Sequence, residues 1–133
     1  MATSSSDALQ ELVQVVAHLR DPEEGCPWDL GQTHASLVPY VLEEAHEVAD
    51  AIRHGNDADL KEELGDLLLQ VVLHAQIAGE EKRFDLEAVV RTISAKLVRR
   101  HPHVFGGEPR SSRLPIKRFA GPVAFTVTLT SLS

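Results

Sequence analysis

Apolar residues recur every three to four positions through the middle of this chain, and one pair, Gly55-Asn56, divides the pattern in two. The apolar stripe before the pair consists of Val41, Ala45, Val48 and Ile52, and the stripe after it consists of Leu60, Leu64, Leu67, Val71 and Ala75. This spacing is typical of helices that bury one face. Because the pair leaves only a short connection, we expect the two helices to be antiparallel neighbours.

The same spacing predicts two further helices, and the full set covers about residues 7–19, 38–54, 57–78 and 86–101. Pro39 is tolerated in the first turn of the second helix, which a helical turn from Thr33 could precede. Residues 21–33, with two prolines and two glycines, are expected to form a loop. The composition, 43% apolar but only 5% aromatic, favours helices over a β-sandwich. The predicted fold class is all-α, a four-helix, bundle-like arrangement.

At 133 residues the chain has room for one domain, which we expect to cover residues 1–108. Residues 109–133 are expected to form an irregular tail. No acidic residue occurs from Ser111 to Ser133, and Phe125 to Thr130 alternate like a strand, although no other strand is predicted to pair with them. We therefore expect this tail to be poorly ordered.

Charge is distributed unevenly along the chain. Residues 1–80 hold 16 acids against 3 Lys/Arg, whereas residues 81–133 hold 4 acids against 10 Lys/Arg. Such a chain could hold cations in one part and anions in the other. The acidic part would repel a phosphate backbone, so no specific nucleic-acid binding is expected.

Several classes of protein are disfavoured by what the sequence lacks. Cys26 is the only cysteine, so neither an internal disulfide nor a cysteine metal cage is possible. No secretory signal is recognisable in Met1 to Gln10. The longest uncharged apolar stretch, Leu67 to Ala78, is about half the ~20 residues of a membrane span. A cytoplasmic protein without membrane association is therefore expected.

Two acidic segments repeat one pattern nineteen residues apart, the first running from Val41 to Val48 and the second from Leu60 to Leu67. Both read apolar, x, Glu, Glu, apolar, x, acid, apolar. In a helix, Glu44 and Glu47 point about 60° apart on one face, as do Glu63 and Asp66. If the two helices pack by their stripes, these four carboxylates meet, and they repel one another unless a cation lies between them.

Mg²⁺ is the cation that this pattern favours, and Mn²⁺ could substitute for it, since carboxylate oxygens predominate and thiolates do not compete. Such ions neutralise phosphate charge and activate a water nucleophile. Gly65 supports a functional site, because a glycine inside a helix costs roughly 1 kcal/mol relative to alanine. Close approach of a backbone or of a ligand would offset that cost.

Other interpretations of the charged residues stay open at this point. Acidic residues on helices usually form a solvated face, and Lys96 and Arg100, four residues apart, could be surface charges at a helix end. Glu43 and His46 have the Glu-x-x-His spacing of a di-iron carboxylate bundle. That class needs a second such pair, and Gly65 stands in the place corresponding to His46.

Beyond these acids, the chain resembles the MazG family of nucleoside triphosphate pyrophosphohydrolases over roughly residues 8–107. Its signature of EExxE followed by ExxD stands here at residues 43–47 and 63–66. The flanking motifs that agree are Cys26-Pro27-Trp28-Asp29, Gln32-Thr33-His34, Pro39-Tyr40, Gly65-Asp66-Leu67-Leu68, and residues 96–105, which run from Lys96 to Phe105.

The resemblance implies an all-α fold that hydrolyses nucleoside triphosphates to monophosphate and pyrophosphate with Mg²⁺, in nucleotide-pool housekeeping. It implies that Glu44, Glu47, Glu63 and Asp66 are catalytic metal ligands and that Lys96, Arg100 and Glu43 serve substrate binding, with Glu43 a nearby acid in the second shell or on an extra ion. It also implies a homodimer or a higher homo-oligomer.

Two features of the chain depart from the family pattern. Many relatives carry two such domains, whereas this chain has one, which resembles the N-terminal copy. Relatives usually continue into a further helix after the His-Pro-His-Val-Phe segment, and residues 111–133 show none. The alternative is a non-catalytic helical oligomer that binds nucleotide or a protein partner, with activity lost through this C-terminus.

Overall fold

The computed structural model describes residues 4–107, which contain six helices and no strand. The helices are α1 (Ser5–Leu19), α2 (Pro27–Leu30), α3 (His34–His54), α4 (Asp57–Glu80), α5 (Leu86–Arg100) and α6 (Pro102–Phe105). The all-α prediction is confirmed, and four of these helices are the long ones expected. The chain divides into two compact units, Met1–Glu87 and Ala88–Ser133, so the single domain over residues 1–108 stays a prediction.

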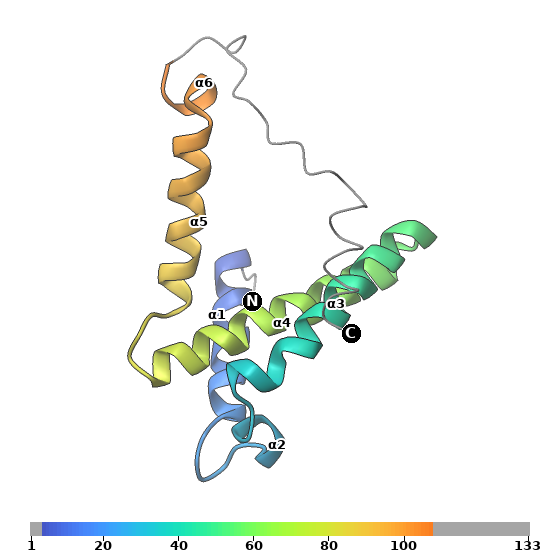
Figure 1. The fold of residues 1–133 in the computed structure, drawn as a ribbon, viewed down its shortest axis with the longest axis vertical. Helices are drawn as coiled ribbons and strands as arrows, with labels where there is room; N and C mark the ends of the chain where they lie inside the picture. Colours follow the sequence, from blue (N-terminus) through green and yellow to red (C-terminus); the bar gives the residue numbers. More distant parts are fainter. Residues whose placement is uncertain (1–3, 108–133) are drawn as a thin grey trace. The chain divides into compact units, whose positions relative to one another are not determined.

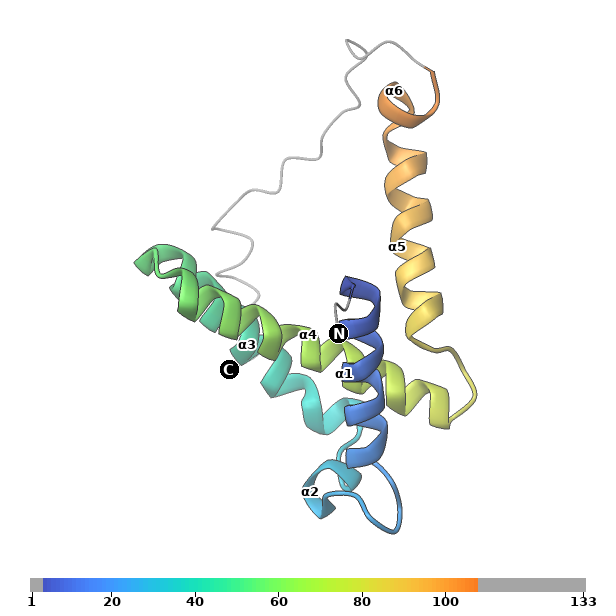
Figure 2. The same ribbon diagram turned by 180° about the vertical axis from the view of Figure 1, so that it is seen from behind.

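Helices α3 and α4 form the antiparallel hairpin that the apolar stripes predicted, and they run side by side in both ribbon views (Figures 1 and 2). Gly55 ends α3 in the left-handed conformation, at a φ of 70°, which favours glycine. Asn56 then caps α4 by accepting a hydrogen bond from the backbone N–H of Asp59 at 3.1 Å. Local sequence therefore determines both the break and the reversal of direction.

The start of α3 lies one turn earlier than residue 38, at His34. Thr33 and Ser36 form a capping box, in which each side chain accepts from the backbone N–H of the other residue. Pro39 consequently lies inside the helix and not in its first turn. Because proline has no N–H, the carbonyl of Ala35 loses its usual intrahelical donor there.

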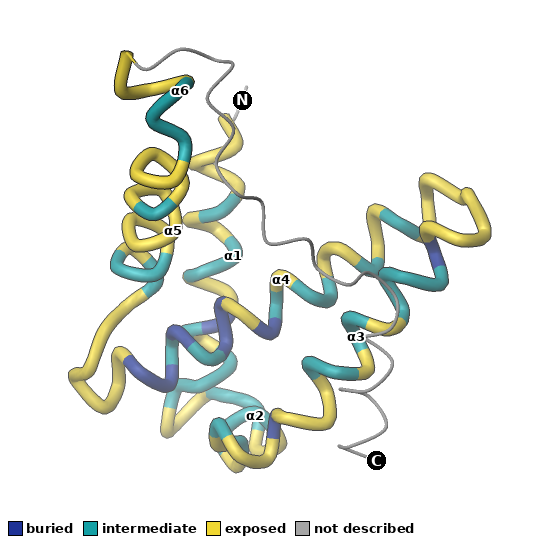
Figure 3. Tube along the Cα trace, turned by 45° about the horizontal axis from the view of Figure 1, so that its top comes forward, coloured by how far each residue is buried: buried dark blue, intermediate teal, exposed yellow. Residues whose placement is uncertain are grey.

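The core of the first unit lies where α1 contacts the C-terminal half of α4. Figure 3 shows the buried positions of α4 gathered on this half of the helix. The cluster consists of Val16, Leu37, Val72, Leu73 and Ile77. Each is at most 5% exposed.

The N-terminal half of α4 and the end of α3 are more exposed than their apolar stripes suggested. Leu64 is 48% exposed, Val71 40% and Ile52 60%, while Ala51 beside Ile52 is buried. The buried positions of α4 therefore all lie in its second half, although Val71 is exposed there, and apolar side chains of the hairpin remain uncovered in the described residues.

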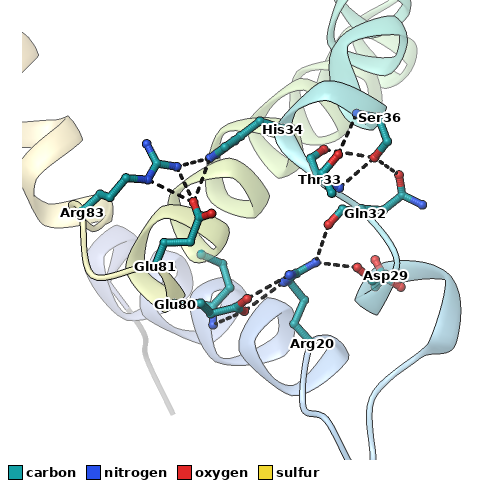
Figure 4. Close-up of polar contacts among 10 residues, drawn as sticks. Arg20, Asp29, Gln32, Thr33, His34, Ser36, Glu80, Glu81 and Arg83 are labelled. Carbon is teal, nitrogen blue, oxygen red and sulfur yellow. Dashed lines mark hydrogen bonds and ion pairs between the residues drawn. The ribbon is translucent and has the colours of Figure 1, made fainter.

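The segment 21–33, predicted as a loop, contains the single-turn helix α2 with Pro27 at its first turn. Proline is favoured at that position because its missing N–H would have no partner there. The segment is fastened by Arg20, which donates to the backbone carbonyls of Asp29 at 2.6 Å and Gln32 at 3.3 Å (Figure 4). Arg20 also binds Glu80 of α4. One guanidinium thus connects α1, the α2 segment and α4.

The second unit contains α6 and nearly all of α5 within the described residues. Pro102 opens α6 directly after α5. The tail predicted over residues 109–133 lies outside the described residues, so its predicted irregularity stays a prediction. Across the part of the chain that the structure describes, no helix is both long enough and apolar enough to cross a membrane.

Candidate functional site

Three of the four predicted metal ligands come together between α3 and α4. Glu44 of α3 and Glu63 and Asp66 of α4 each offer a carboxylate oxygen, and these oxygens all lie within 4.8 Å of one another. The antiparallel hairpin produces this meeting, because it places the acidic turn of α3 beside the acidic turn of α4. We call these three residues the acidic cluster.

The acidic cluster gathers negative charge on one side of the hairpin. The pKa of Glu44 is raised, first by burial of the carboxylate and then by the charges of Asp66, Glu43 and Glu47. The pKa of Glu63 is raised for the same reasons, with burial first and the Asp66 charge second. Both shifts mean that ionising these carboxyl groups is less favourable than ionising an ordinary glutamate. A bound cation would reverse this penalty.

Glu47, the fourth predicted ligand, lies on α3 outside the trio of closely spaced oxygens. Its charge nevertheless contributes to the raised pKa of both Glu44 and Glu63, so it belongs to the same electrostatic environment. Glu43 is exposed on α3 and also raises the pKa of Glu44. The structure therefore separates three convergent carboxylates from two that act at longer range.

Lys96 and Arg100, predicted to bind phosphate, lie four residues apart on α5. Arg100 is exposed and Lys96 is half-buried. Both belong to the second unit, whereas the acidic cluster belongs to the first. Their spacing on one helix lets them act together on one anion.

The environment of Gly65 is open. A Cβ added at this position would meet no atom within 4 Å outside its own helix, among the residues that the structure describes. Packing within this part of the chain therefore does not explain the glycine. Gly65 directly precedes Asp66 of the acidic cluster in the sequence.

His46 does not join the acidic cluster. Its Nε2 lies 3.5 Å from Asp50 Oδ2, one turn further along α3, and both side chains are at least 38% exposed. Among residues 4–107, the acidic cluster is the only group of three or more potential metal ligands, and it contains carboxylates alone. The arrangement therefore gives no support to a di-iron site with a histidine ligand.

Gln70 is a buried polar residue of α4 that the sequence did not single out. It lies on α4 one turn after Asp66, is only 7% exposed, and its Oε1 has no hydrogen-bond partner among the described residues. The only signal for it in the sequence was its interruption of an apolar run. An unpaired buried oxygen of this kind carries a desolvation cost.

A separate cavity of about 250 Å³ lies between α1 and α4, away from the acidic cluster. Its lining is largely apolar and includes Val13, Val72 and Leu86. Glu80 reaches it, but that carboxylate is already bound by Arg20. This cavity shares no lining residue with the acidic cluster.

Comparison with known proteins gives consistent matches over the helical region. Over 100 residues, the chain is 58% identical to the nucleoside triphosphate pyrophosphohydrolase/pyrophosphatase MazG of Thermotoga maritima. This match covers 75% of this chain and 39% of that protein. It is 56% identical over 97 residues to the nucleoside triphosphate pyrophosphohydrolase of Escherichia coli, with 73% and 37% covered. The chain thus spans under two fifths of the length of these curated relatives.

The solved structure of a mazG-related protein from Thermotoga maritima has a similar fold. Its TM-score is 0.61 at 30% sequence identity, with 74% of this chain and 84% of that chain covered. Residues 32–105, which include the whole acidic cluster, match the model of the MazG nucleotide pyrophosphohydrolase domain. The chain therefore belongs to the MazG nucleotide pyrophosphohydrolase domain family.

Proposed function

We propose that this chain hydrolyses nucleoside triphosphates to nucleoside monophosphate and pyrophosphate in a reaction that depends on Mg²⁺. The observation that carries the proposal is the convergence of Glu44, Glu63 and Asp66 within 4.8 Å. Membership of the MazG family and the names of the relatives support the reaction type. The proposed role is housekeeping of the nucleotide pool.

The donor set fits a hard divalent cation. Three carboxylates with no thiolate or imidazole among them suit Mg²⁺, with Mn²⁺ as a substitute. Glu44, Glu63 and Asp66 would hold the ion, and Glu47 is proposed as a fourth ligand. A divalent ion held there supplies charge neutralisation for phosphate oxygens and activates water. The pKa values of Glu44 and Glu63 are raised by burial and by neighbouring acids, and a bound cation would stabilise the charged form of both carboxylates.

The chain's own cations are proposed to bind the triphosphate. Lys96 and Arg100 are four residues apart, so one phosphate group can accept hydrogen bonds from both. Their positive charges would stabilise the negative charge that develops on the leaving pyrophosphate. Glu43, exposed beside Glu44, is proposed to bind at the edge of the same site.

The test is release of pyrophosphate from a panel of ribo- and deoxyribonucleoside triphosphates with Mg²⁺, by an assay that distinguishes pyrophosphate from phosphate. We expect turnover that Glu63→Gln and Glu47→Ala reduce by at least ten-fold. Glu62→Gln is the matched control, because it removes the adjacent acid of α4, which is outside the acidic cluster, and activity should be retained.

Two results would contradict this assignment. One is the absence of pyrophosphate release with either Mg²⁺ or Mn²⁺, and the other is full activity in Glu63→Gln and Glu47→Ala. Nucleotide-dependent thermal stabilisation without turnover would instead identify a non-catalytic nucleotide-binding protein.

We also propose that the chain forms a homodimer or a higher homo-oligomer and works in the cytoplasm. The exposed apolar side chains of the hairpin, among them Ile52, Leu64 and Leu68, support association. A second copy that covered them would remove apolar surface from water.

A further inference from the structure

The first residue of α3 and the C-terminal half of α4 are joined by two histidine rings. Nδ1 of His34 lies 2.7 Å from Nδ1 of His74, the ring planes differ by 2°, and the ring centroids are 5.0 Å apart. The centroids are farther apart than the nitrogens by about the width of a ring. The rings therefore meet edge to edge in nearly one plane, as an N–H···N hydrogen bond requires.

The second nitrogen of His34 determines where the protons are. Arg83 donates from Nη2 to Nε2 of His34 (Figure 4), and a guanidinium group can only donate. Nε2 of His34 therefore carries no proton, and in a neutral ring the proton is on Nδ1, which donates to His74. Nδ1 of His74 is then the acceptor, so the His74 proton is on Nε2. The bond between the rings and the bond from Arg83 together require two neutral rings in opposite tautomers.

One added proton preserves the Nδ1···Nδ1 bond only if both Nε2 atoms carry hydrogen. Nε2 of His34 can then no longer accept from Arg83. An acceptor within reach is Oε1 of Glu81 at 3.7 Å, which Arg83 already binds at 2.6 Å. A second proton would place hydrogen on both Nδ1 atoms, and the bond between the rings would be lost.

We propose that His34 and His74 form a proton-sensitive contact, which holds the N-terminus of α3 against α4 at neutral pH and releases it when acidification protonates both rings. The charged groups that face the pair are Arg83 and Glu81, from the residues that follow α4. The Arg20–Glu80 ion pair lies near the same end of α4 (Figure 4). One positive and one negative side chain thus lie beside the His34 ring.

The environment of His74 supports this contact independently of the hydrogen-bond geometry. Burial lowers the pKa of His74, and the neighbouring His34 lowers it further. The neutral ring is therefore favoured near pH 7. Because α3 carries Glu44 and α4 carries Glu63 and Asp66, loosening this end would act on the hairpin that brings the acidic cluster together.

Nitrogen NMR of the imidazole rings in the full chain tests the tautomers without any substitution. At pH 7.5 we expect the proton of His34 on Nδ1 and that of His74 on Nε2. Between pH 7.5 and 5 their signals should change together, and His74 should gain its proton at a lower pH than an ordinary histidine does. A His34 ring protonated at Nε2 at pH 7.5, or rings that titrate independently, would overturn the proposal.

Thermal unfolding of His34→Gln provides the second test, since glutamine can donate and accept but does not titrate. The loss of Tm from pH 7.5 to 5 should be smaller than in the wild type by several degrees. His54→Gln is the matched control, because within residues 4–107 the His54 ring bonds the backbone of its own helix, at Asp50, and the wild-type loss should persist. An equal loss in His34→Gln and the wild type would contradict the proposal. Neither readout depends on catalytic activity.

Discussion

Arg20 and Glu80, sixty residues apart in sequence, are joined by two parallel hydrogen bonds between α1 and α4. Nε of Arg20 donates to Oε2 at 2.9 Å and Nη2 donates to Oε1 at 2.8 Å. The Arg20 side chain is only 8% exposed, and its third nitrogen, Nη1, donates to the carbonyls of Asp29 and Gln32. A bidentate pair of this kind has fixed geometry, which surface lysine pairs lack.

Substitution of this pair should destabilise the first unit. Glu80→Gln leaves a buried guanidinium without its charged partner, and we expect a loss of about 1–2 kcal/mol in the free energy of unfolding, reduced by the 36% exposure of Glu80. Urea denaturation measures this. Arg20→Lys should also destabilise this unit, because lysine cannot form both parallel hydrogen bonds to Glu80. Arg53→Lys is its matched control, because the Arg53–Asp50 pair is exposed within α3 and should contribute under about 0.5 kcal/mol. Equal effects at both positions would contradict this account.

The contribution of Glu80 should depend on pH in a defined direction. Its pKa is lowered below the ordinary 4.5, chiefly by the hydrogen bond from Arg20, while burial opposes the shift. A lowered pKa in the folded state gives stability that is present above the unfolded value and is lost as pH falls through the folded value. The stability difference between the wild type and Glu80→Gln should therefore be constant from pH 7 to about 5.5 and shrink below pH 4.5. Denaturation curves at several pH values measure this difference in unfolding free energy. A difference that grows on acidification would contradict the prediction.

Local sequence patterns predicted the elements of this fold better than the contacts between distant elements. The four long helices were expected within a few residues of their ends, since stripes, caps and the Gly55-Asn56 break are local. The short helices α2 and α6 were missed, although Pro27 and Pro102 stand at their first turns, where proline is favoured. The contacts Arg20–Glu80 and His34–His74 depend on tertiary packing, which periodicity does not contain.

For the candidate site, helical phase was sufficient to bring Glu44, Glu63 and Asp66 together in the prediction, because only one turn joins their helices. Phase alone did not distinguish Glu47, which is on the same helix as Glu44 but outside the tight trio. Nor could it indicate that Gln70 is buried, since burial depends on what α4 packs against.

Removing one carboxylate of the acidic cluster should stabilise the metal-free protein at neutral pH. The folded-state pKa of Glu63 is raised, so its favourable contribution is present below the unfolded value and is lost as pH rises through the folded value. Glu63→Gln should therefore have a higher Tm than the wild type at pH 7 without metal, and the gap should close below about pH 4. The difference in Tm between Glu62→Gln and the wild type should be smaller, because Glu62 has the weakest effect of the four charges that raise the pKa of Glu63.

Mg²⁺ should reverse the order of Tm between the wild type and Glu63→Gln. An ion that binds only the folded state raises Tm, and the wild type offers it one more carboxylate than Glu63→Gln does. Thermal unfolding with increasing Mg²⁺ should raise the wild-type Tm more steeply than that of the variant. Parallel increases in both proteins would show that Glu63 does not contribute to binding.

Core and surface leucines of the hairpin should respond differently to truncation. Leu37 is fully buried, so Leu37→Ala should cost about 2–5 kcal/mol of unfolding free energy. Leu64 is 48% exposed, and Leu64→Ala should cost much less in a monomer. If a second copy covers Leu64, Leu64→Ala should instead weaken association in sedimentation experiments. An unchanged oligomer with unchanged stability would remove this surface from the proposed interface.

Gly65→Ala should separate helix stability from ligand access. The added methyl group meets no atom within 4 Å outside its own helix in the described part of the chain, so the substitution should raise the free energy of unfolding by about 0.5–1 kcal/mol. If the space beside Asp66 receives substrate, pyrophosphate release should nevertheless fall, mainly through a higher KM. Gain of stability with unchanged kinetics would show that the space is not used. Loss of stability would show that a neighbouring copy or a residue outside 4–107 occupies it.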